Sequence, residues 1–210
     1  MTTVFAASLS SCKETDNEKE EFPNWQKTNE AYYDKKYAEV KQLVNGGAAD
    51  WKVLRSWSLD DKLATHSYDY VLANVLNAGT GSGCPLYTDS VKVHYSGRLL
   101  PSTSYAKGYI FDQSWQGEYN LSTMKPRTFA VSGVVKGFAT ALQNMHIGDR
   151  WQVYIPHQLA YGSSDKPGAA YSTLIFDITL VGYFRKTSTA AAPSKDGAAQ
   201  QQTAGYWVYE

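Results

Sequence analysis

The chain of 210 residues has little cysteine and no excess of either charge. It contains 2 Cys, 4 His, 20 basic and 20 acidic side chains, and no long block of one sign. A protein that binds nucleic acid usually gathers Lys and Arg on one surface. We therefore expect no nucleic-acid partner.

Long hydrophobic runs are missing as well. No stretch of about 18 or more apolar residues occurs, which is the length expected of a transmembrane helix. Any association with a membrane would therefore need an anchor.

Signatures of cofactor chemistry are also absent. The histidines, His66, His94, His146 and His157, show no metal-ligand spacing. Neither a phosphate-binding glycine motif nor a Gly-x-Ser-x-Gly elbow is present. We expect no metal and no other cofactor, and the sequence disfavours nucleotide and acyl-transfer chemistry.

The first twelve residues have the composition of a processing signal. A short run of apolar and small residues ends in the sequence LSSC at 9–12, and the chain then becomes polar and acidic. This resembles the lipobox of bacterial lipoproteins, whose cysteine becomes the first mature residue and carries the lipid. The resemblance implies a signal at 1–12, lipidation of Cys12 and anchorage in the bacterial cell envelope, facing the periplasm or the cell surface.

The two cysteines leave other interpretations open. In an ordinary N-terminal segment, Cys12 and Cys84 could form a disulfide or stay reduced. If Cys12 is acylated, Cys84 is a single loop thiol in a glycine-rich stretch. We do not expect Cys84 to act as a nucleophile.

Residues 13–66 are predicted to form a tether and an N-terminal helical extension. Charged residues dominate 13–22, whereas apolar residues recur at three- and four-residue steps within 25–44, as in an amphipathic helix. This helix could form a homodimer or pack on its own domain. The segment 51–59 could be an extra strand or a packing arm.

From residue 67 the pattern changes to strands separated by turns. In 91–95 the apolar residues alternate with Lys92 and His94, and the same alternation recurs in 151–155 and 174–180. Such alternation predicts an antiparallel sheet with one buried face.

A single short helix is predicted between these strands. Its apolar residues fall at helical spacing, at Val135, Phe138, Leu142 and Met145. The predicted fold class is α+β, with a curved antiparallel β-sheet wrapped around this helix over residues 67–185. Residues 186–210 are predicted to be a disordered tail whose aromatic end could dock on another surface.

Several short motifs occur in a fixed order within this domain. They are VKVHYSG at 91–97, FD at 111–112, GVVKGF at 133–138, MHIGDR at 145–150, IP at 155–156, LAYG at 159–162 and TLIFDI at 173–178. Together they resemble the pattern of FKBP-type peptidyl-prolyl cis/trans isomerases over about 115 residues. The family fold is the α+β fold predicted from the periodicity.

The chemistry implied by this resemblance needs no nucleophile. Rotation about an X-Pro bond breaks amide resonance against a barrier of about 18–20 kcal/mol and forms no covalent intermediate. The twisted amide is less polar than the planar one. A dry aromatic pocket with a few placed hydrogen-bonding groups therefore binds the transition state more tightly than the ground state.

The resemblance implies a set of site residues, namely Tyr95, Phe111, Asp112, Val134, Val135, Phe138, Tyr161 and Phe176. Asp112 would orient or polarise the substrate, Tyr161 would bond a substrate carbonyl, and Phe138 would form the pocket floor in place of a tryptophan. Without the resemblance, the buried aromatics would be core residues, and Asp112 would cap a loop or pair with an arginine.

The sequence departs from the family pattern in three loops. Residues 101–109 form an insertion, and Arg127 or Thr128 falls where another pocket aromatic often lies. Ala169 and Ala170 stand where a bulky aliphatic residue normally presses on the proline ring. The two alanines predict a pocket that is shallower on that side.

The leading functional hypothesis is a foldase that isomerises X-Pro bonds of proline-containing polypeptides in the cell envelope, with macrolides of the rapamycin type as possible ligands. The alternative is a non-catalytic FKBP-like binding or chaperone lipoprotein. In that case, substitution of Asp112 or Phe138 would leave its biological role intact.

Overall fold

The computed structural model describes residues 20–187 and 204–209, so the predicted signal and Cys12 lie outside the described residues. Its main elements in chain order are α1 (Trp25–Asn45), β1 (Trp51–Arg55), β2 (Tyr70–Asn77), β3 (Ser90–Arg98), β4 (Ile110–Gln113), β5 (Arg127–Ala130), α2 (Lys136–Leu142), β6 (Arg150–Ile155), β7 (Leu174–Lys186) and β8 (Gly205–Val208). Short 3-10 helices lie between them, including η2 (Ser67–Asp69) and η4 (His157–Leu159).

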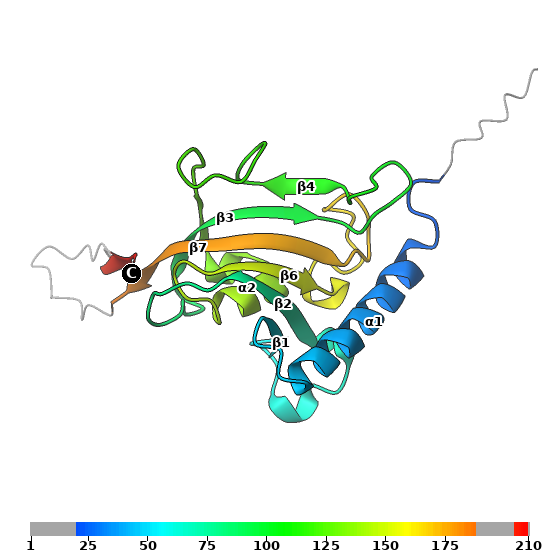
Figure 1. The fold of residues 1–210 in the computed structure, drawn as a ribbon, viewed down its shortest axis with the longest axis horizontal. Helices are drawn as coiled ribbons and strands as arrows, with labels where there is room; N and C mark the ends of the chain where they lie inside the picture. Colours follow the sequence, from blue (N-terminus) through cyan, green and yellow to red (C-terminus); the bar gives the residue numbers. More distant parts are fainter. Residues whose placement is uncertain (1–19, 188–203, 210) are drawn as a thin grey trace, which may run out of the picture.

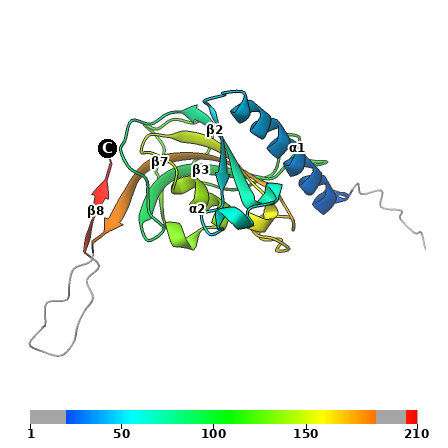
Figure 2. The ribbon, with the colours of Figure 1, turned by 90° about the horizontal axis from the view of Figure 1, so that it is seen from below.

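The strands form one antiparallel sheet with the order β1-β2-β6-β7-β3-β4. β5 pairs with β3, and β8 pairs with β7. Figures 1 and 2 show a curved sheet with α2 against one face and α1 at one end. The predicted α+β class is confirmed.

The core lies between the sheet and α2. Apart from its first residue, every residue of α2 is buried. The helix approaches the sheet so closely that a Cβ atom on Gly137 would lie 2.2 Å from Ile155 Cγ2. A side chain at residue 137 would therefore push α2 away from β6.

The opposite face of the sheet is partly covered, which the alternation did not predict. His94 is 3% exposed and Thr179 is 5% exposed, although both lie on this face. The loop after β4 covers Thr179, since the Tyr119 hydroxyl lies 2.7 Å from Thr179 Oγ1. Burial lowers the pKa of His94. The prediction of a single buried face was therefore wrong for this region.

The predicted helix at 25–44 is confirmed as α1, and it packs on its own domain. Trp25 Nε1 donates to Ser172 Oγ at 2.7 Å, and the Tyr33 hydroxyl donates to the carbonyl of Tyr70 at 2.8 Å. Leu43, expected on the packed face, is 38% exposed. A homodimer through α1 stays a prediction.

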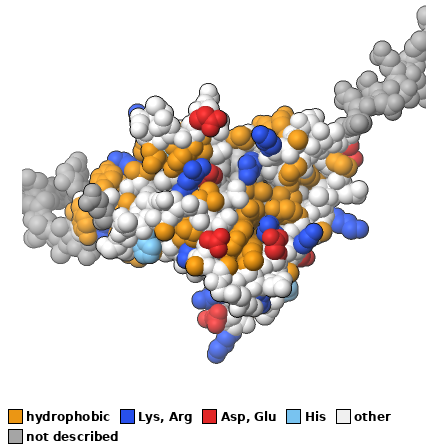
Figure 3. All heavy atoms as spheres, in the orientation of Figure 1, with side chains coloured by type: hydrophobic (Ala, Val, Ile, Leu, Met, Phe, Trp, Pro, Cys, Tyr) orange, Lys and Arg blue, Asp and Glu red, His pale blue; other side chains and the backbone are white. Residues whose placement is uncertain are grey.

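No helix in the described ranges is both long and apolar enough to cross a membrane. In the face shown in Figure 3, Lys and Arg side chains are interspersed with Asp and Glu and separated by hydrophobic side chains. That face therefore presents no extended surface of one charge.

The sheet begins within the predicted N-terminal extension. β1 pairs with β2 from Trp51 opposite Asn74 to Arg55 opposite Tyr70. The segment 51–59 therefore contributes an extra strand. It adds an edge to the sheet before the predicted domain start at 67.

The predicted tail is ordered at its described end. Gly205–Val208 forms β8, which pairs with β7 from Tyr183 to Lys186. Trp207 lies 5.6 Å from Phe184 between ring centroids, and Lys92 Nζ lies 4.4 Å from the Trp207 ring centroid. The prediction of disorder over 186–210 was wrong for these residues, because the aromatic end docks on its own sheet.

Candidate functional site

All eight residues predicted for the isomerase site line a single cavity of about 350 Å³. β3 contributes Tyr95, β4 contributes Phe111 and Asp112, and β7 contributes Phe176. The remaining predicted residues come from the turn into α2, from α2 itself and from the loop after η4, as Val134, Val135, Phe138 and Tyr161. Their catalytic roles stay predictions.

Aromatic rings set nearly at right angles form the apolar wall of this cavity. The Phe176 centroid lies 5.0 Å from that of Phe138 and 5.5 Å from that of Phe111, at interplanar angles of 83° and 85°. Edge-to-face contacts of this kind stabilise a ring cluster beyond its burial alone. The cluster can receive a compact apolar ring.

Gly97 allows two of these rings to meet. A Cβ atom at this position would lie 2.4 Å from Phe176 Cε1 and 2.7 Å from Phe111 Cζ. Because a side chain would collide with both rings, the glycine after Tyr95 in the motif of β3 is part of the pocket architecture.

Polar groups gather at the Asp112 carboxylate. The Tyr95 hydroxyl donates to Asp112 Oδ2 at 2.6 Å, and Arg127 Nη1 lies 3.6 Å from Asp112 Oδ1. Burial raises the pKa of Tyr95 well above its ordinary value, and its bond to Asp112 raises it further. The phenol therefore stays a protonated donor.

Tyr161 presents a second phenol to the cavity. Burial and the nearby Asp112 charge raise the pKa of Tyr161 above its ordinary value. Among the residues that the structure describes, its hydroxyl has no hydrogen-bond partner. It is therefore able to donate to a carbonyl group that enters the cavity.

The predicted set omits three residues that line this cavity, Phe129, Gly133 and Lys166. Phe129 lies 5.4 Å from Tyr95 between ring centroids, and Lys166 is part of the lining. The expectation that Arg127 or Thr128 replaces a pocket aromatic was incomplete, because β5 directs Phe129 into the site. The available signal was that Arg127 and Phe129 are two residues apart and so share one face of β5.

The two alanines in the loop after Tyr161 lie outside this cavity. Neither Ala169 nor Ala170 lines it, and Ala169 is buried. The shallower pocket expected on that side stays a prediction. The insertion at 101–109 instead meets the start of the described chain, where Ser102 Oγ donates to Glu21 Oε1 at 2.5 Å.

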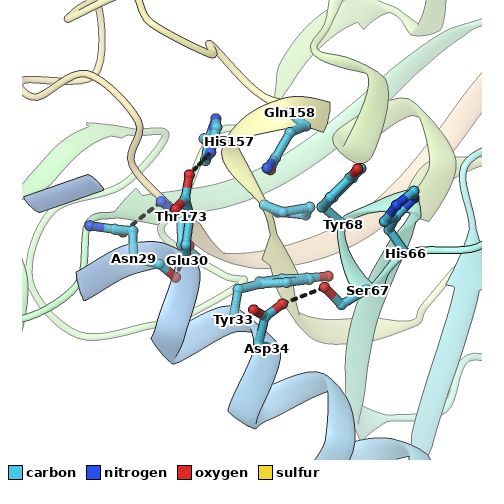
Figure 4. Close-up of a pocket in the computed structure, with 11 residues that line it drawn as sticks. Asn29, Glu30, Tyr33, Asp34, His66, Ser67, Tyr68, His157, Gln158 and Thr173 are labelled. Atoms are coloured by element: carbon cyan, nitrogen blue, oxygen red, sulfur yellow. Dashed lines mark hydrogen bonds and ion pairs between the residues drawn. The ribbon is translucent and has the colours of Figure 1, made fainter. Parts of the chain in front are cut away.

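A second cavity of about 370 Å³ lies between α1 and the domain, and Figure 4 shows its lining. Its side chains mostly pair with one another. Ser67 donates to Asp34, His157 Nε2 lies 3.3 Å from Glu30 Oε1, and Asn29 Oδ1 accepts from the Thr173 amide. This cavity shares no lining residue with the aromatic pocket, and its bonds join α1 to η2 and η4.

Elsewhere in the described residues, metal-ligating and nucleophilic side chains form no second site of this kind. No group of three His, Cys, Asp or Glu residues suited to a metal ion occurs within 20–187 and 204–209. Cys84 Sγ lies 3.8 Å from His146 Nδ1, and burial raises the pKa of its thiol. A raised pKa disfavours the thiolate that a nucleophile requires.

The geometry defines an α+β domain with an aromatic pocket, a carboxylate held by a phenol and a guanidinium, and a second free phenol. Residues 84–181 match the model of the FKBP-type peptidyl-prolyl cis-trans isomerase family. The match covers somewhat less than half of the chain, and over this segment the chain is similar to that family.

Curated relatives show the same similarity. The FKBP-type 22 kDa peptidyl-prolyl cis-trans isomerase of Escherichia coli is 36% identical over 109 residues, which cover 51% of this chain and 47% of that protein. The outer membrane protein MIP of Legionella longbeachae is 38% identical over 109 residues, covering 51% and 41%.

The similarity to a third relative extends further along the chain. The FKBP-type peptidyl-prolyl cis-trans isomerase FkpA of Escherichia coli is 28% identical over 163 residues, covering 77% of this chain and 56% of that protein. The chain thus spans about half the length of the curated relatives it matches.

Proposed function

We propose that the domain is a peptidyl-prolyl cis/trans isomerase that acts on proline-containing polypeptides. The observation that carries this proposal is the meeting of Tyr95, Asp112, Phe138 and Phe176 in one cavity. Residues 84–181 match the isomerase family, which supports the same conclusion.

In this proposal the aromatic wall receives the proline ring. The ring cluster of Phe111, Phe138 and Phe176 excludes water from the prolyl nitrogen, and a drier surrounding favours the less polar, twisted amide. The free hydroxyl of Tyr161 holds a substrate carbonyl. Asp112, held by Tyr95 and Arg127, provides a fixed negative charge near the rotating bond.

The test is cis-to-trans conversion of a short X-Pro peptide by the full chain, beside Asp112→Ala and Phe138→Ala. We expect a rate above the spontaneous one that falls at least about tenfold in each variant, since each removes a transition-state contact. Inhibition by rapamycin would support a macrolide-binding pocket. A folded wild type that gives no acceleration would refute the proposal.

We also propose a place in the bacterial cell envelope, with a lipid anchor on Cys12. The sequence LSSC at 9–12 supports the anchor, and a relative named as an outer membrane protein supports the location. Mass spectrometry of the mature N-terminus tests it. We expect an acylated Cys12 when the full chain is expressed in a bacterial host that processes lipoproteins. An unmodified Met1 on protein from such a host would refute the anchor.

A binding module without catalysis is the second candidate. Exposed apolar side chains outside the matched segment favour it, since Trp57 is 40% exposed and Leu63 is 65% exposed. Such side chains can hold an unfolded client. Suppression of client aggregation that persists in Asp112→Ala, without isomerase activity in the wild type, would favour this candidate.

A further inference from the structure

The charged groups at the aromatic pocket do not balance. Among its lining residues, Asp112 carries the carboxylate and Lys166 carries an ammonium group. Arg127 already lies 3.6 Å from the Asp112 carboxylate. One carboxylate is therefore matched by one guanidinium, and Lys166 remains as an additional positive charge at the cavity.

Lys166 is an exposed side chain that lines the pocket, and it has no acidic partner among the described residues. Its Nζ atom lies 5.5 Å from the centroid of Tyr161, whose ring also lines the cavity. No carboxylate in the described parts of the chain comes within ion-pair distance of this ammonium group. The neighbouring Asp165 is exposed and does not line the pocket.

The net charge of the whole chain does not attract charged ligands to the pocket. Its formal net charge is zero, so long-range attraction does not favour ligands of either sign. Any preference of the pocket for charged ligands must come from charged side chains close to it. Of the charged side chains that line the pocket, Lys166 is the one without a partner of opposite charge.

We propose that the pocket favours polypeptides carrying an acidic side chain directly before or after the proline, and that Lys166 determines this specificity. The inference rests on the proposed binding of proline in this cavity. A cavity of about 350 Å³ with an aromatic wall accommodates the proline ring, so the flanking residues lie at the rim. There a carboxylate comes within reach of Lys166.

The test uses two sets of short peptides in which the residue before or after proline is Glu, Gln or Lys. Binding to the full chain is measured by NMR titration, and kcat/KM is measured separately. At low ionic strength we expect the affinity for Glu peptides to exceed that for Gln peptides by about threefold at one position at least. This ratio corresponds to the attraction between two opposite charges about 6 Å apart in water. Salt at about 0.5 M should remove most of this preference.

Variants assign the preference to one residue. Lys166→Met should bring the Glu-to-Gln ratio of affinities close to one, and Lys166→Glu should invert it. Lys27→Met is the matched control, because it removes the same charge from the exposed surface of α1 and should keep the ratio. Circular dichroism checks that each variant is folded.

The outcomes separate this inference from the proposed activity. Equal affinity of the wild type for Glu, Gln and Lys peptides would overturn it, as would a preference that survives in Lys166→Met. Charge-dependent binding without acceleration would refute the isomerase proposal and leave the specificity standing. Failure to bind any proline peptide would overturn both.

Discussion

At the scale of single residues, the Asp112 carboxylate depends on neighbours from two other strands. Tyr95 of β3 donates a hydrogen bond to one oxygen, and Arg127 of β5 lies near the other. Because the Asp112 side chain is 48% exposed, solvent weakens the ion pair with Arg127. The shorter contact, from the Tyr95 hydroxyl, contributes more to its orientation.

Tyr95→Phe should therefore impair the site with little effect on folding. The variant keeps the ring but removes the donor to Asp112. Hydrogen bonds to charged groups contribute about 1.5–3 kcal/mol, and we expect a smaller loss of stability, about 1 kcal/mol, because water replaces the donor at a half-exposed carboxylate. If the bond orients Asp112 during catalysis, kcat/KM should fall about threefold to tenfold.

The measurements are peptide isomerisation and urea unfolding, with Tyr105→Phe as the control. Tyr105 is 43% exposed and does not line the pocket, so its variant should behave as the wild type does. An unchanged kcat/KM in Tyr95→Phe would show that this hydrogen bond does not serve the reaction.

At the scale of elements, α1 is joined to the domain by buried polar contacts. Asn29 is completely buried, its Oδ1 atom accepts from the Thr173 amide at 2.7 Å, and its Nδ2 atom donates to the Trp25 carbonyl at 2.8 Å. Thr173 directly precedes β7, which carries Phe176. One asparagine thus connects the helix with the strand that supports the pocket.

Asn29→Ala should loosen α1. The substitution leaves the Thr173 amide without its partner, at a cost of about 1–3 kcal/mol in the free energy of unfolding. Urea unfolding should show this loss, and hydrogen exchange should accelerate along 25–45. Lys35→Ala, at an exposed position of α1, should change stability by no more than about 0.5 kcal/mol. Equal exchange rates in Asn29→Ala and the wild type would contradict the proposed role of Asn29 in fixing α1 to the domain.

At the scale of the whole molecule, buried phenols govern the response to alkali. Burial raises the pKa of Tyr32 to about 12, and it raises the pKa values of Tyr33, Tyr95, Tyr154 and Tyr161 above their ordinary range. Above about pH 10, the unfolded chain loses phenolic protons that the folded chain keeps. Stability due to these groups is therefore complete below about pH 10 and is lost as the pH rises further.

The free energy of unfolding should thus fall between about pH 10 and 12. Urea titrations at pH 9, 10 and 11 test this, and the slope should be smaller in Tyr32→Phe, which removes one of the shifted groups. Stability that stays constant or rises from pH 9 to 11 would contradict the role assigned to the buried phenols.

The sequence by itself determined the elements whose pattern is local. Strict alternation predicted β3 and β7, and helical spacing predicted α1 and α2, because each pattern lies within one continuous segment. The order of the short motifs, through their resemblance to a family, also predicted most of the residues that line the pocket. Their arrangement follows from the strands, the helix and the loops that carry them.

Only the tertiary structure decided which residues from loops and chain ends complete these elements. Residues 205–208 pair with 183–186 across an intervening segment whose composition predicted disorder, and Tyr119 of the loop after β4 bonds to Thr179 on the sheet. Lys166 reaches the pocket because its loop returns beside Tyr161. Such contacts join distant parts of the chain, so their geometry depends on the packed sheet and not on any local periodicity.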